Sequence, residues 1–360
     1  MLRKKIFIIG SAGIPARYGG FETYAENIAS LLSQTYNVCV VCNRKLYTKN
    51  ERVHNGREYV KLIYLHINSN GIFSLFYDFI SLLIAYKSSD FTILLGAGGS
   101  IFLPFFKIFR MPPIATHIDG MEWQRHKWNK LVGIYLRINT RLAIQYSNYI
   151  LLDNQAMKSY IPQRYLNKVI ITSYGGDHIP SVGLKEEINN RPYALVIARA
   201  EPENNIHCFL EAFKKIKDLE LIIVSNWKDT KYGRNLYRKY AFHNNIKLTG
   251  PIYNDPVKLQ TLRKRCMVYL HGHSAGGTNP SLIEAMYSGI PIIAFDSEFN
   301  RNTSDNLAIY FKSVEELIDS IQVIIKGNSQ NNVRKMQEFA FKHYTWNNAI
   351  KPLKELLDRS

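Results

Sequence analysis

Short apolar runs alternate with amphipathic stretches along the whole chain. The apolar runs are rich in Ile, Val, Leu and Tyr and are bounded by polar or glycine-containing turns, which is typical of strands buried on both faces. Between them, apolar residues recur at helical spacing. Strands that alternate with helices predict an α/β fold with parallel sheets covered on both sides. The predicted strands are Lys5–Ile9, Asn37–Cys42, Tyr59–Leu65, Thr92–Leu95, Ile114–Ile118, Tyr149–Leu152, Val169–Ile171, Tyr193–Ile197, Leu219–Val224, Ile246–Leu248, Val268–Leu270 and Ile290–Ala294.

The length of the chain predicts more than one domain. Its 360 residues exceed what one hydrophobic core usually serves. The polar, non-periodic stretch Gly183–Arg191 interrupts the alternation and is interpreted as a linker. We therefore expect one Rossmann-like domain over residues 1–183 and a second over residues 191–345, followed by a terminal helix in residues 346–360. Ligands of such sheets bind beyond the carboxyl ends of the strands, so we expect the ligand in the crevice between the two domains.

The run His271–Pro291 reads HGHSAGGTNPSLIEAMYSGIP and carries the most specific chemical signal. Its small residues lie between an apolar strand and a helix, so free backbone N–H groups and the positive end of the helix dipole meet there. Glu284 follows in the first turns of the helix and can accept hydrogen bonds from ribose hydroxyl groups. The pattern therefore indicates a sugar-nucleotide site in which the loop residues Gly277, Thr278 and Asn279 contact the diphosphate.

Two further strand ends carry groups that can act on a phosphate. Gly19 and Gly20 close the loop after the first strand and expose N–H groups at the start of a helix. No Gly-Lys-Ser/Thr sequence follows, so this loop is not a Walker A motif. Arg199 follows the strand Tyr193–Ile197, and its planar guanidinium can hold two oxygens of a leaving diphosphate.

The strand end at residues 114–118 carries candidate acceptor-side groups. His117 and Asp119 lie two positions apart and therefore share a strand face. An Asp at such a position can orient a hydroxyl group or accept its proton. We expect Asp119 to act in catalysis and His117 to face the acceptor.

The charge balance indicates a negatively charged partner. The chain has 46 Lys and Arg against 29 Asp and Glu, a formal net charge of +17. It lacks the sequence signatures of helix-turn-helix, RNP and zinc-finger proteins, so phosphorylated substrates and anionic lipid are favoured over nucleic acid. Arg125, Lys127 and Trp128 suit lipid headgroups, although a solvated helix start has the same composition. Ile101–Met111 is interpreted as an interfacial segment or a buried helix.

Four segments together resemble the GT-B glycosyltransferases of the family-4 type, namely residues 10–22, 119–123, 199–205 and 271–291. Within that family, residues 10–22 and 271–291 are most similar to the rhamnosyltransferase-like branch of bacterial polysaccharide biosynthesis, which has a DUF1972-type N-terminal domain. The resemblance implies two Rossmann-like domains that face an interdomain cleft, and a last helix that returns to the first domain. It also implies transfer of a hexosyl residue with retention, from dTDP-rhamnose to a lipid-linked saccharide of a capsule, O-antigen or exopolysaccharide.

Two positions depart from the family pattern. Asn204, which we keep as a donor-site residue, stands where the family places a Lys that grips the diphosphate together with Arg199. Gly276 stands where the family places the first of two glutamates, so Glu284 lacks its usual partner at the sugar. We hypothesise that His273, His271 or the loop amides contact the sugar instead. No Asp-x-Asp occurs near a strand end, so neither a metal ion nor another cofactor is expected.

Three alternatives stay open. The donor can be another nucleotide sugar, since a few contacts decide the base and the sugar. A GT-B sugar-nucleotide epimerase would share the donor half, and so would a non-catalytic protein that binds sugar nucleotides or lipid.

No apolar stretch reaches the ~18 to 20 residues that a membrane-spanning helix needs, and no signal-sequence pattern precedes the first strand. We expect a cytoplasmic protein that associates with the inner face of the cell membrane.

Overall fold

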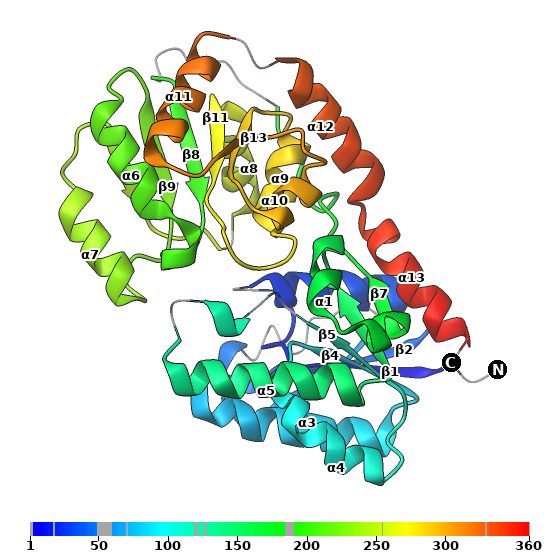
Figure 1. The fold of residues 1–360 in the computed structure, drawn as a ribbon. Coiled ribbons are helices and arrows are strands. Elements are labelled where there is room, and N and C mark those ends of the chain that lie inside the picture. The colour runs from blue at the N-terminus through cyan, green and yellow to red at the C-terminus, as the bar shows by residue number, and fades with distance from the viewer. Residues whose placement is uncertain are drawn as a thin grey trace. The chain divides into compact units, whose positions relative to one another are not determined.

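The computed structural model describes residues 3–16, 19–48, 60–69, 71–118, 120, 122–125, 128–183, 191–253, 255–327 and 330–359. The chain folds into two compact units, each built around one parallel sheet (Figure 1). The first unit is made of residues 1–123, 128–173 and 346–360, and the second of residues 124–127 and 174–345. Two parallel sheets with helices between successive strands are the predicted α/β architecture, which is confirmed.

The described part of the first unit has a seven-stranded parallel sheet in the order β3-β2-β1-β4-β5-β6-β7. β1 lies near its centre, with Ile6 opposite Val38 of β2 and Phe91 of β4. Nearly all side chains of β1 and β4 are buried, because helices cover both faces of the sheet, and these strands therefore read as continuous apolar runs. The strands are β1 Lys5–Ile9, β2 Asn37–Asn43, β3 Val60–Leu65, β4 Phe91–Leu95, β5 Ile114–His117, β6 Tyr149–Leu152 and β7 Val169–Ile171.

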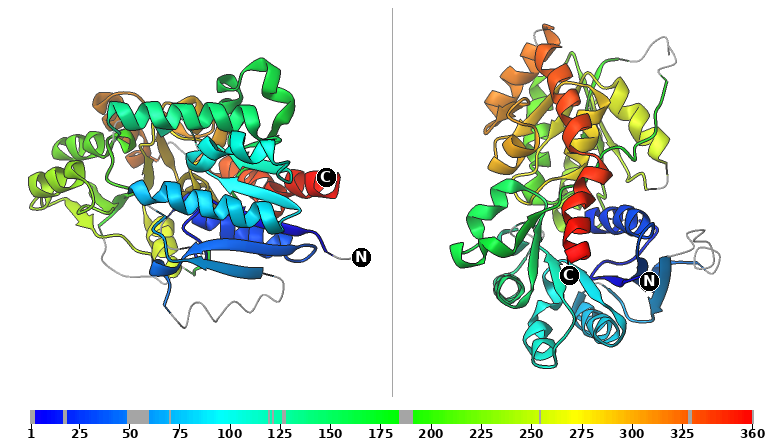
Figure 2. Two further views of the ribbon diagram at one scale, coloured as in Figure 1. Left: turned by 90° about the horizontal axis from the view of Figure 1, so that it is seen from below. Right: turned by 90° about the vertical axis from the view of Figure 1, so that its right-hand side faces the viewer.

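The strand order decides which face of this sheet each helix covers. The step from β1 to β2 runs toward one edge of the sheet, whereas the step from β3 to β4 and each later step run toward the other edge. Right-handed crossovers therefore put α1 on one face and α3, α4 and α5 on the opposite face (Figures 1 and 2). The helices are α1 Gly20–Leu32, α3 Ser74–Ser88, α4 Leu103–Ile108, α5 Lys130–Tyr146 and α13 Trp346–Arg359. Short 3₁₀ turns occur at η1 Arg44–Leu46, η2 Gly71–Phe73, η3 Gly98–Phe102, η4 Glu122–Gln124, η5 Gln155–Tyr160 and η6 Gln163–Lys168.

The last helix belongs to the first unit, although the chain reaches it from the second. α13 contacts α1 and β7, and the centre of the Trp346 ring lies 6.1 Å from that of Tyr24. Lys4 Nζ donates a hydrogen bond to the Leu357 carbonyl oxygen (2.8 Å). The last helix is thus anchored at both of its ends within the first unit.

The described part of the second unit has a six-stranded parallel sheet in the order β10-β9-β8-β11-β12-β13. β8 lies between β9 and β11, with Leu195 opposite Ile222 and Tyr269. The strands are β8 Tyr193–Ile197, β9 Glu220–Val224, β10 Ile246–Thr249, β11 Val268–His271, β12 Ile292–Phe295 and β13 Ile309–Phe311. The helices are η7 Pro202–Asn204, α6 Ile206–Lys215, α7 Lys231–Tyr240, α8 Pro256–Arg265, α9 Pro280–Ser288, α10 Glu298–Thr303, α11 Val314–Ile325 and α12 Gln330–His343.

A few elements differ from those predicted. β13 falls outside the predicted strands, because three residues after a polar stretch give no periodic signal. β12 begins two residues late, since Pro291 precedes it and cannot donate a ladder hydrogen bond. Residues 174–183, placed with the first domain from sequence, pack with the second unit. Tyr59, at the start of another predicted strand, lies outside the described residues.

Candidate functional site

The strand order of the second unit brings two loops together. β8 pairs with β9 on one side and with β11 on the other. The order of the sheet therefore reverses between β8 and β11, and in open α/β sheets ligands bind at this point, beyond the carboxyl ends of the strands. The loop after β8, residues 198–205, contains Arg199. The loop after β11, residues 272–279, is called the glycine loop below.

The glycine loop is held at its start by the loop that follows β8. A side chain on Gly272 would collide with the Asn204 carbonyl oxygen, so this position needs glycine. Asn205 Nδ2 donates a hydrogen bond to the Gly272 carbonyl oxygen (2.8 Å). The backbone N–H and the hydroxyl group of Ser274 both donate to the Glu203 carbonyl oxygen, each at 2.9 Å. These contacts fix the two loops to each other.

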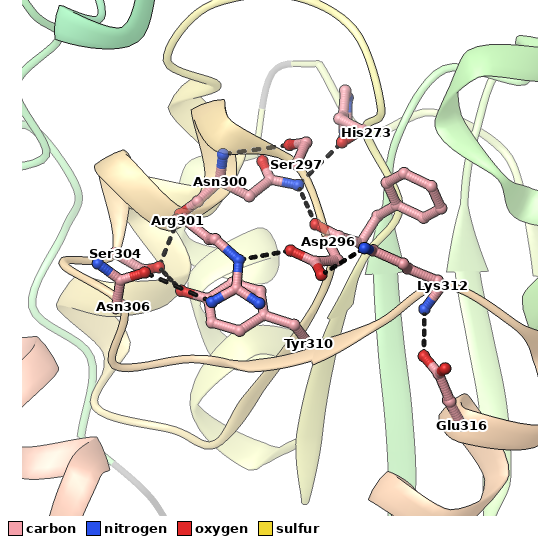
Figure 3. A network of polar contacts seen from close by, with 11 residues as sticks. His273, Asp296, Ser297, Asn300, Arg301, Ser304, Asn306, Tyr310, Lys312 and Glu316 are labelled. Carbon is pink, nitrogen blue, oxygen red and sulfur yellow. Dashed lines mark hydrogen bonds and ion pairs between the residues drawn. The ribbon is translucent and has the colours of Figure 1, made fainter.

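A polar network around α10 supports the glycine loop from another side (Figure 3). Asn300 of α10 is buried, and its Nδ2 donates to the carbonyl oxygens of His273 (2.9 Å) and Phe295 (2.8 Å). The next residue, Arg301, donates from Nε to Asp296 Oδ1 at 2.5 Å. The backbone at the start of the glycine loop is therefore tied to α10 as well as to the loop after β8.

Farther along, the glycine loop has backbone groups to offer to a ligand. Gly276 has a φ of +115°, a conformation that favours glycine. α9 begins at Pro280, and the side chain of its N-cap residue Asn279 makes no capping hydrogen bond. Within the part of the chain that the structure describes, the N–H groups of Ala275, Gly276 and Gly277 donate no backbone hydrogen bond. Unused N–H groups beside a helix N-terminus suit an anionic group such as a phosphate.

Glu284 lies on α9, and two groups hold its carboxylate. Arg263 of α8 pairs with Glu284 Oε2, and His178 Nε2 lies 3.5 Å from Oε1. Burial by itself would raise the pKa of the Glu284 carboxyl, but the charge of Arg263 and the contact with His178 bring this pKa below its ordinary value. Glu284 is therefore an ionised hydrogen-bond acceptor with a fixed orientation at neutral pH.

Two arginines lie on either side of the Glu201 carboxylate. Arg199 Nη1 is 3.9 Å from Glu201 Oε1, and Arg125 Nη1 is 3.9 Å from Oε2. The Arg199 side chain is 43% exposed, whereas that of Arg125 is 9% exposed. The sequence suggested a lipid-facing place for Arg125, and the structure instead buries its guanidinium in the second unit, to which residues 124–127 belong.

His271 and His273 stack on each other, with ring centres 4.4 Å apart and planes inclined by 16°. Burial lowers the pKa of His271 to about 3. The pKa of His273 is also well below its ordinary value, first because of burial and then because of His271, Arg199 and Arg125. Both rings are neutral at physiological pH, so they offer hydrogen-bonding atoms and not charge to a ligand.

Asn204, at the position where a lysine was expected, has a supporting place in the structure. Its side chain is buried, and its Nδ2 donates to the Arg199 carbonyl oxygen at 2.8 Å. Its own carbonyl oxygen packs against Gly272. Asn204 therefore fixes the backbone that carries Arg199, and Arg125 provides a second positive charge near the same loop.

The predicted turn at Gly19 and Gly20 forms the start of α1 in the first unit. The loop before it is tied to the same helix. Ala12 N donates to Glu22 Oε1 (3.0 Å), and Glu26, one turn farther along α1, accepts a second N–H of that loop at 2.9 Å. Acidic side chains of α1 therefore bind two N–H groups of the loop that precedes Gly19.

His117 lies at the end of β5, in the interior of the first unit. It is fully buried against the rings of Phe21 and Tyr24, with ring centres 5.3 and 4.9 Å away. Burial lowers the pKa of His117 to about 3. The structure thus places this side chain in the core and not toward an acceptor, because α1 covers the strand end. Asp119 and Lys127 lie outside the described residues.

Trp128 is exposed, as the sequence suggested. Its side chain is 40% accessible, and its Nε1 donates to Glu122 Oε2 at 3.1 Å. The segment Ile101–Met111 is partly buried and partly exposed. Phe106 of α4 is buried in the core, whereas Ile108 two residues later is exposed.

Sequence patterns alone did not point to Arg263, His178 or Glu201. Arg263 begins a run of three basic residues at the end of α8, a common composition for a last helical turn. Its burial depends on the packing of α8 against α9, and no local pattern reveals this. Among the residues that the structure describes, no group of three or more His, Cys, Asp or Glu side chains is placed to hold a metal ion.

Two protein families match the two halves of the chain. A domain of unknown function, DUF1972, matches residues 3–177. The family of glycosyl transferases group 1 matches residues 184–343. No curated protein matches the sequence.

Solved structures resemble the fold over nearly its whole length. Sucrose-phosphate synthase from Thermosynechococcus elongatus has a TM-score of 0.83 at 13% identity, over 99% of both chains. HepE from Anabaena, in complex with UDP-glucose, has a TM-score of 0.75 at 13% identity, over 99% of this chain and 100% of that chain. A glycosyltransferase from Rickettsia africae has a TM-score of 0.72 at 12% identity, over 98% of this chain and 97% of that chain. At such identities the likeness concerns the fold.

Proposed function

Because the chain is a GT-B glycosyltransferase whose second half matches the group 1 family, we propose that it transfers a hexosyl residue from a nucleotide diphosphate sugar to a hydroxyl group of a lipid-linked saccharide. One observation carries the proposal. The glycine loop, the Glu284 carboxylate held by Arg263, and the Arg199 and Arg125 guanidinium groups are gathered in one unit, beyond β8 and β11. They are the kinds of group that a nucleotide diphosphate requires.

Each part of the donor has a candidate partner in this group. The unused N–H groups of the glycine loop bind the diphosphate, and Arg199 and Arg125 neutralise its charge. Glu284 accepts hydrogen bonds from the ribose hydroxyl groups. His273, whose ring is neutral, donates or accepts a hydrogen bond at the sugar.

The reaction proposed is a transfer with retention. The bond between the sugar C1 atom and a diphosphate oxygen breaks, and the acceptor oxygen bonds to C1 on the same face of the sugar. The acceptor proton passes to the departing phosphate oxygen, and Asp119 orients the acceptor hydroxyl group. The arginines and the loop amides stabilise the charge that grows on the leaving diphosphate. In this proposal no protein nucleophile, metal ion or other cofactor takes part.

For the donor we favour dTDP-rhamnose. Support comes from the resemblance of residues 10–22 and 271–291 to the rhamnosyltransferase-like branch, and from Gly276, which leaves fewer groups for sugar hydroxyls to meet. A UDP-activated sugar is the second candidate, since HepE of similar fold was solved with UDP-glucose. Few contacts separate these donors, so the two candidates share the same site.

The acceptor would place the enzyme at the inner face of the cell membrane, in capsule, O-antigen or exopolysaccharide assembly. The net charge of +17 supports contact with an anionic partner. No helix within the described ranges has the length and apolar character needed to cross a bilayer.

Thermal unfolding in the presence of candidate donors tests the donor site. The ligands are dTDP, dTDP-rhamnose, UDP, UDP-glucose and GDP, and a ligand at a hundred times its Kd stabilises the folded state by about 2.7 kcal/mol. We expect stabilisation by the dTDP compounds that is lost in Glu284→Ala and kept in the matched control Glu338→Ala, whose side chain is 62% exposed on α12. Unchanged melting with every nucleotide would contradict the proposal.

Product analysis separates the enzyme classes. Incubation of the donor with a lipid-linked acceptor should yield a longer saccharide and free nucleotide diphosphate. Release of an isomerised nucleotide sugar without acceptor would favour the epimerase. Donor binding without transfer to any acceptor would favour a non-catalytic binding protein.

A further inference from the structure

The outer side of α5 carries an apolar stripe in the first unit. Leu131, Ile134 and Ile138 follow one another at spacings of three and four residues, so they lie on one side of the helix. Their side chains are 78%, 56% and 46% exposed. The helix turns its other side to the core, where the buried residues are Asn139, Thr140, Ala143 and Ile144.

α4, which packs beside α5, also exposes apolar side chains. Phe105, Ile108 and Phe109, at the end of the helix and just after it, are 51%, 77% and 52% exposed, and the Phe105 and Phe109 rings lie 4.9 Å apart. α4 contacts α5 directly, and Figure 2 shows α3, α4 and α5 beside one another over the same face of the sheet. We call Phe105, Ile108, Phe109 and the three residues of α5 the α4–α5 face. Single exposed apolar side chains are common, but a group of them on two helices in contact is a candidate interaction surface.

Both helices that form the α4–α5 face carry exposed positive charges, and neither contains an Asp or Glu. Residues 91–118 and 123–152 contain no Asp or Glu. In α3, the acidic residue is Asp78, which is buried. The cations exposed on α4, on α5 and directly after α4 are Lys107, Arg110, Lys130, Arg137 and Arg141.

We infer that the α4–α5 face docks on the headgroup layer of an anionic lipid bilayer. Apolar side chains ringed by long cationic side chains suit this partner, because the rings and aliphatic groups enter the acyl boundary while the cations reach the lipid phosphates. A second copy of the chain fits less well, since the same face on the partner would bring like charges together and interface cores are poor in charge. The inference rests on the proposed function only in that a lipid-linked acceptor gives the docking its purpose.

Vesicle sedimentation tests the docking without donor or acceptor. We expect the full chain to bind vesicles of phosphatidylcholine with phosphatidylglycerol, and to bind vesicles of phosphatidylcholine alone far less. The double variant Ile108→Ser, Leu131→Ser should lose at least about tenfold in partitioning to the anionic vesicles. The double variant Arg137→Gln, Arg141→Gln should lose about fivefold for each charge removed, and wild-type binding should weaken with added salt.

Phe242 provides the matched control. It is 94% exposed in the second unit, so Phe242→Ser removes an equally accessible apolar side chain away from the α4–α5 face and should leave vesicle binding unchanged. The response of melting to nucleotides should stay unchanged in every surface variant, which separates failure of docking from failure of the donor site.

Two results would overturn the inference. One is vesicle binding by the Ile108→Ser, Leu131→Ser variant equal to that of the wild type, or no binding by the wild type. The other is a dimer in sedimentation velocity that this variant converts to a monomer, since the face would then be an interface between copies of the chain.

Discussion

The guanidinium group of Arg263 is buried against the carboxylate of Glu284, so that a charge at the end of α8 fixes the orientation of the carboxylate on α9. His178 Nε2 lies 3.5 Å from the other carboxylate oxygen. A carboxylate held in this way loses little freedom when it accepts a hydrogen bond from a ligand. Arg263 is therefore a positioning residue for Glu284.

Arg263→Met should lower the free energy of unfolding at pH 7 by up to about 3 kcal/mol, because it leaves a buried carboxylate without its partner. Burial then dominates the pKa of Glu284 and raises it, so protonation relieves the penalty and the loss of stability should be smaller at pH 5 than at pH 7. Urea unfolding at both pH values checks this. In the wild type, stability changes with pH in the opposite direction. The lowered pKa of Glu284 contributes stability above pH about 4.3, and this contribution is lost in stronger acid.

The double variant Arg263→Met, Glu284→Gln is the control for this effect. It removes the unpaired charge and should recover part of the stability without recovering donor binding. Equal stability of Arg263→Met and the wild type at pH 7 would show that the pair is not coupled.

Arg199→Met and Arg125→Met should each lower kcat by about a hundredfold, the usual loss when one stabilising donor is removed from a leaving group. Steady-state transfer assays give kcat and KM separately. Arg334→Met, on the exposed surface of α12, removes the same charge where it is 84% exposed and should have no effect. A normal kcat in Arg125→Met would show that Arg125 does not act on the leaving diphosphate.

Asn204→Lys restores the residue of the family pattern and should nevertheless harm the protein. The position is buried, and the new side chain would displace the amide that holds the Arg199 carbonyl oxygen. We expect the free energy of unfolding to fall by about 1–3 kcal/mol, because the hydrogen bond to the Arg199 carbonyl oxygen is lost and a charge is placed in the interior. Differential scanning calorimetry measures it, and a gain in stability together with tighter donor binding would contradict the structural role of Asn204.

Gly272→Ala should destabilise the second unit by about 1–3 kcal/mol, since the added methyl group meets the Asn204 carbonyl oxygen. The same substitution at Gly250, where a Cβ atom meets no neighbour within 4 Å, is the control and should leave the melting temperature nearly unchanged. Calorimetry of the two variants distinguishes a glycine with close neighbours from one with open space around it. Similar melting of both would show that the two loops can separate at no cost.

His117→Phe should weaken the dependence of stability on pH. The pKa of His117 is about 3 in the folded chain and about 6.5 when unfolded, so the unfolded state binds the proton first as the pH falls. Stability is therefore complete above pH about 6.5 and decreases toward pH 3, by up to about 1.4 kcal/mol per pH unit for such a histidine. Urea unfolding between pH 7.5 and 5 should give a shallower slope for the variant, and an unchanged slope would contradict this account.

Local sequence predicted most of the fold because strands such as Lys5–Ile9 are buried on both faces and lie between strong turn signals. It did not predict β13 (Ile309–Phe311), which is too short to show a period. The sequence also located the glycine loop and Glu284, since a loop of small residues before a helix has the same meaning in any α/β sheet.

Tertiary structure alone decided how the glycine loop and Glu284 are held. The run His271–Pro291 by itself determined that a loop rich in N–H groups precedes a helix with a carboxylate on its first turns. Arg263, which orients that carboxylate, and Arg125, which lies beside Glu201, come from segments whose local composition is that of an ordinary basic surface. Their burial depends on long-range packing, and packing against distant elements leaves no periodic trace in the segments that it joins.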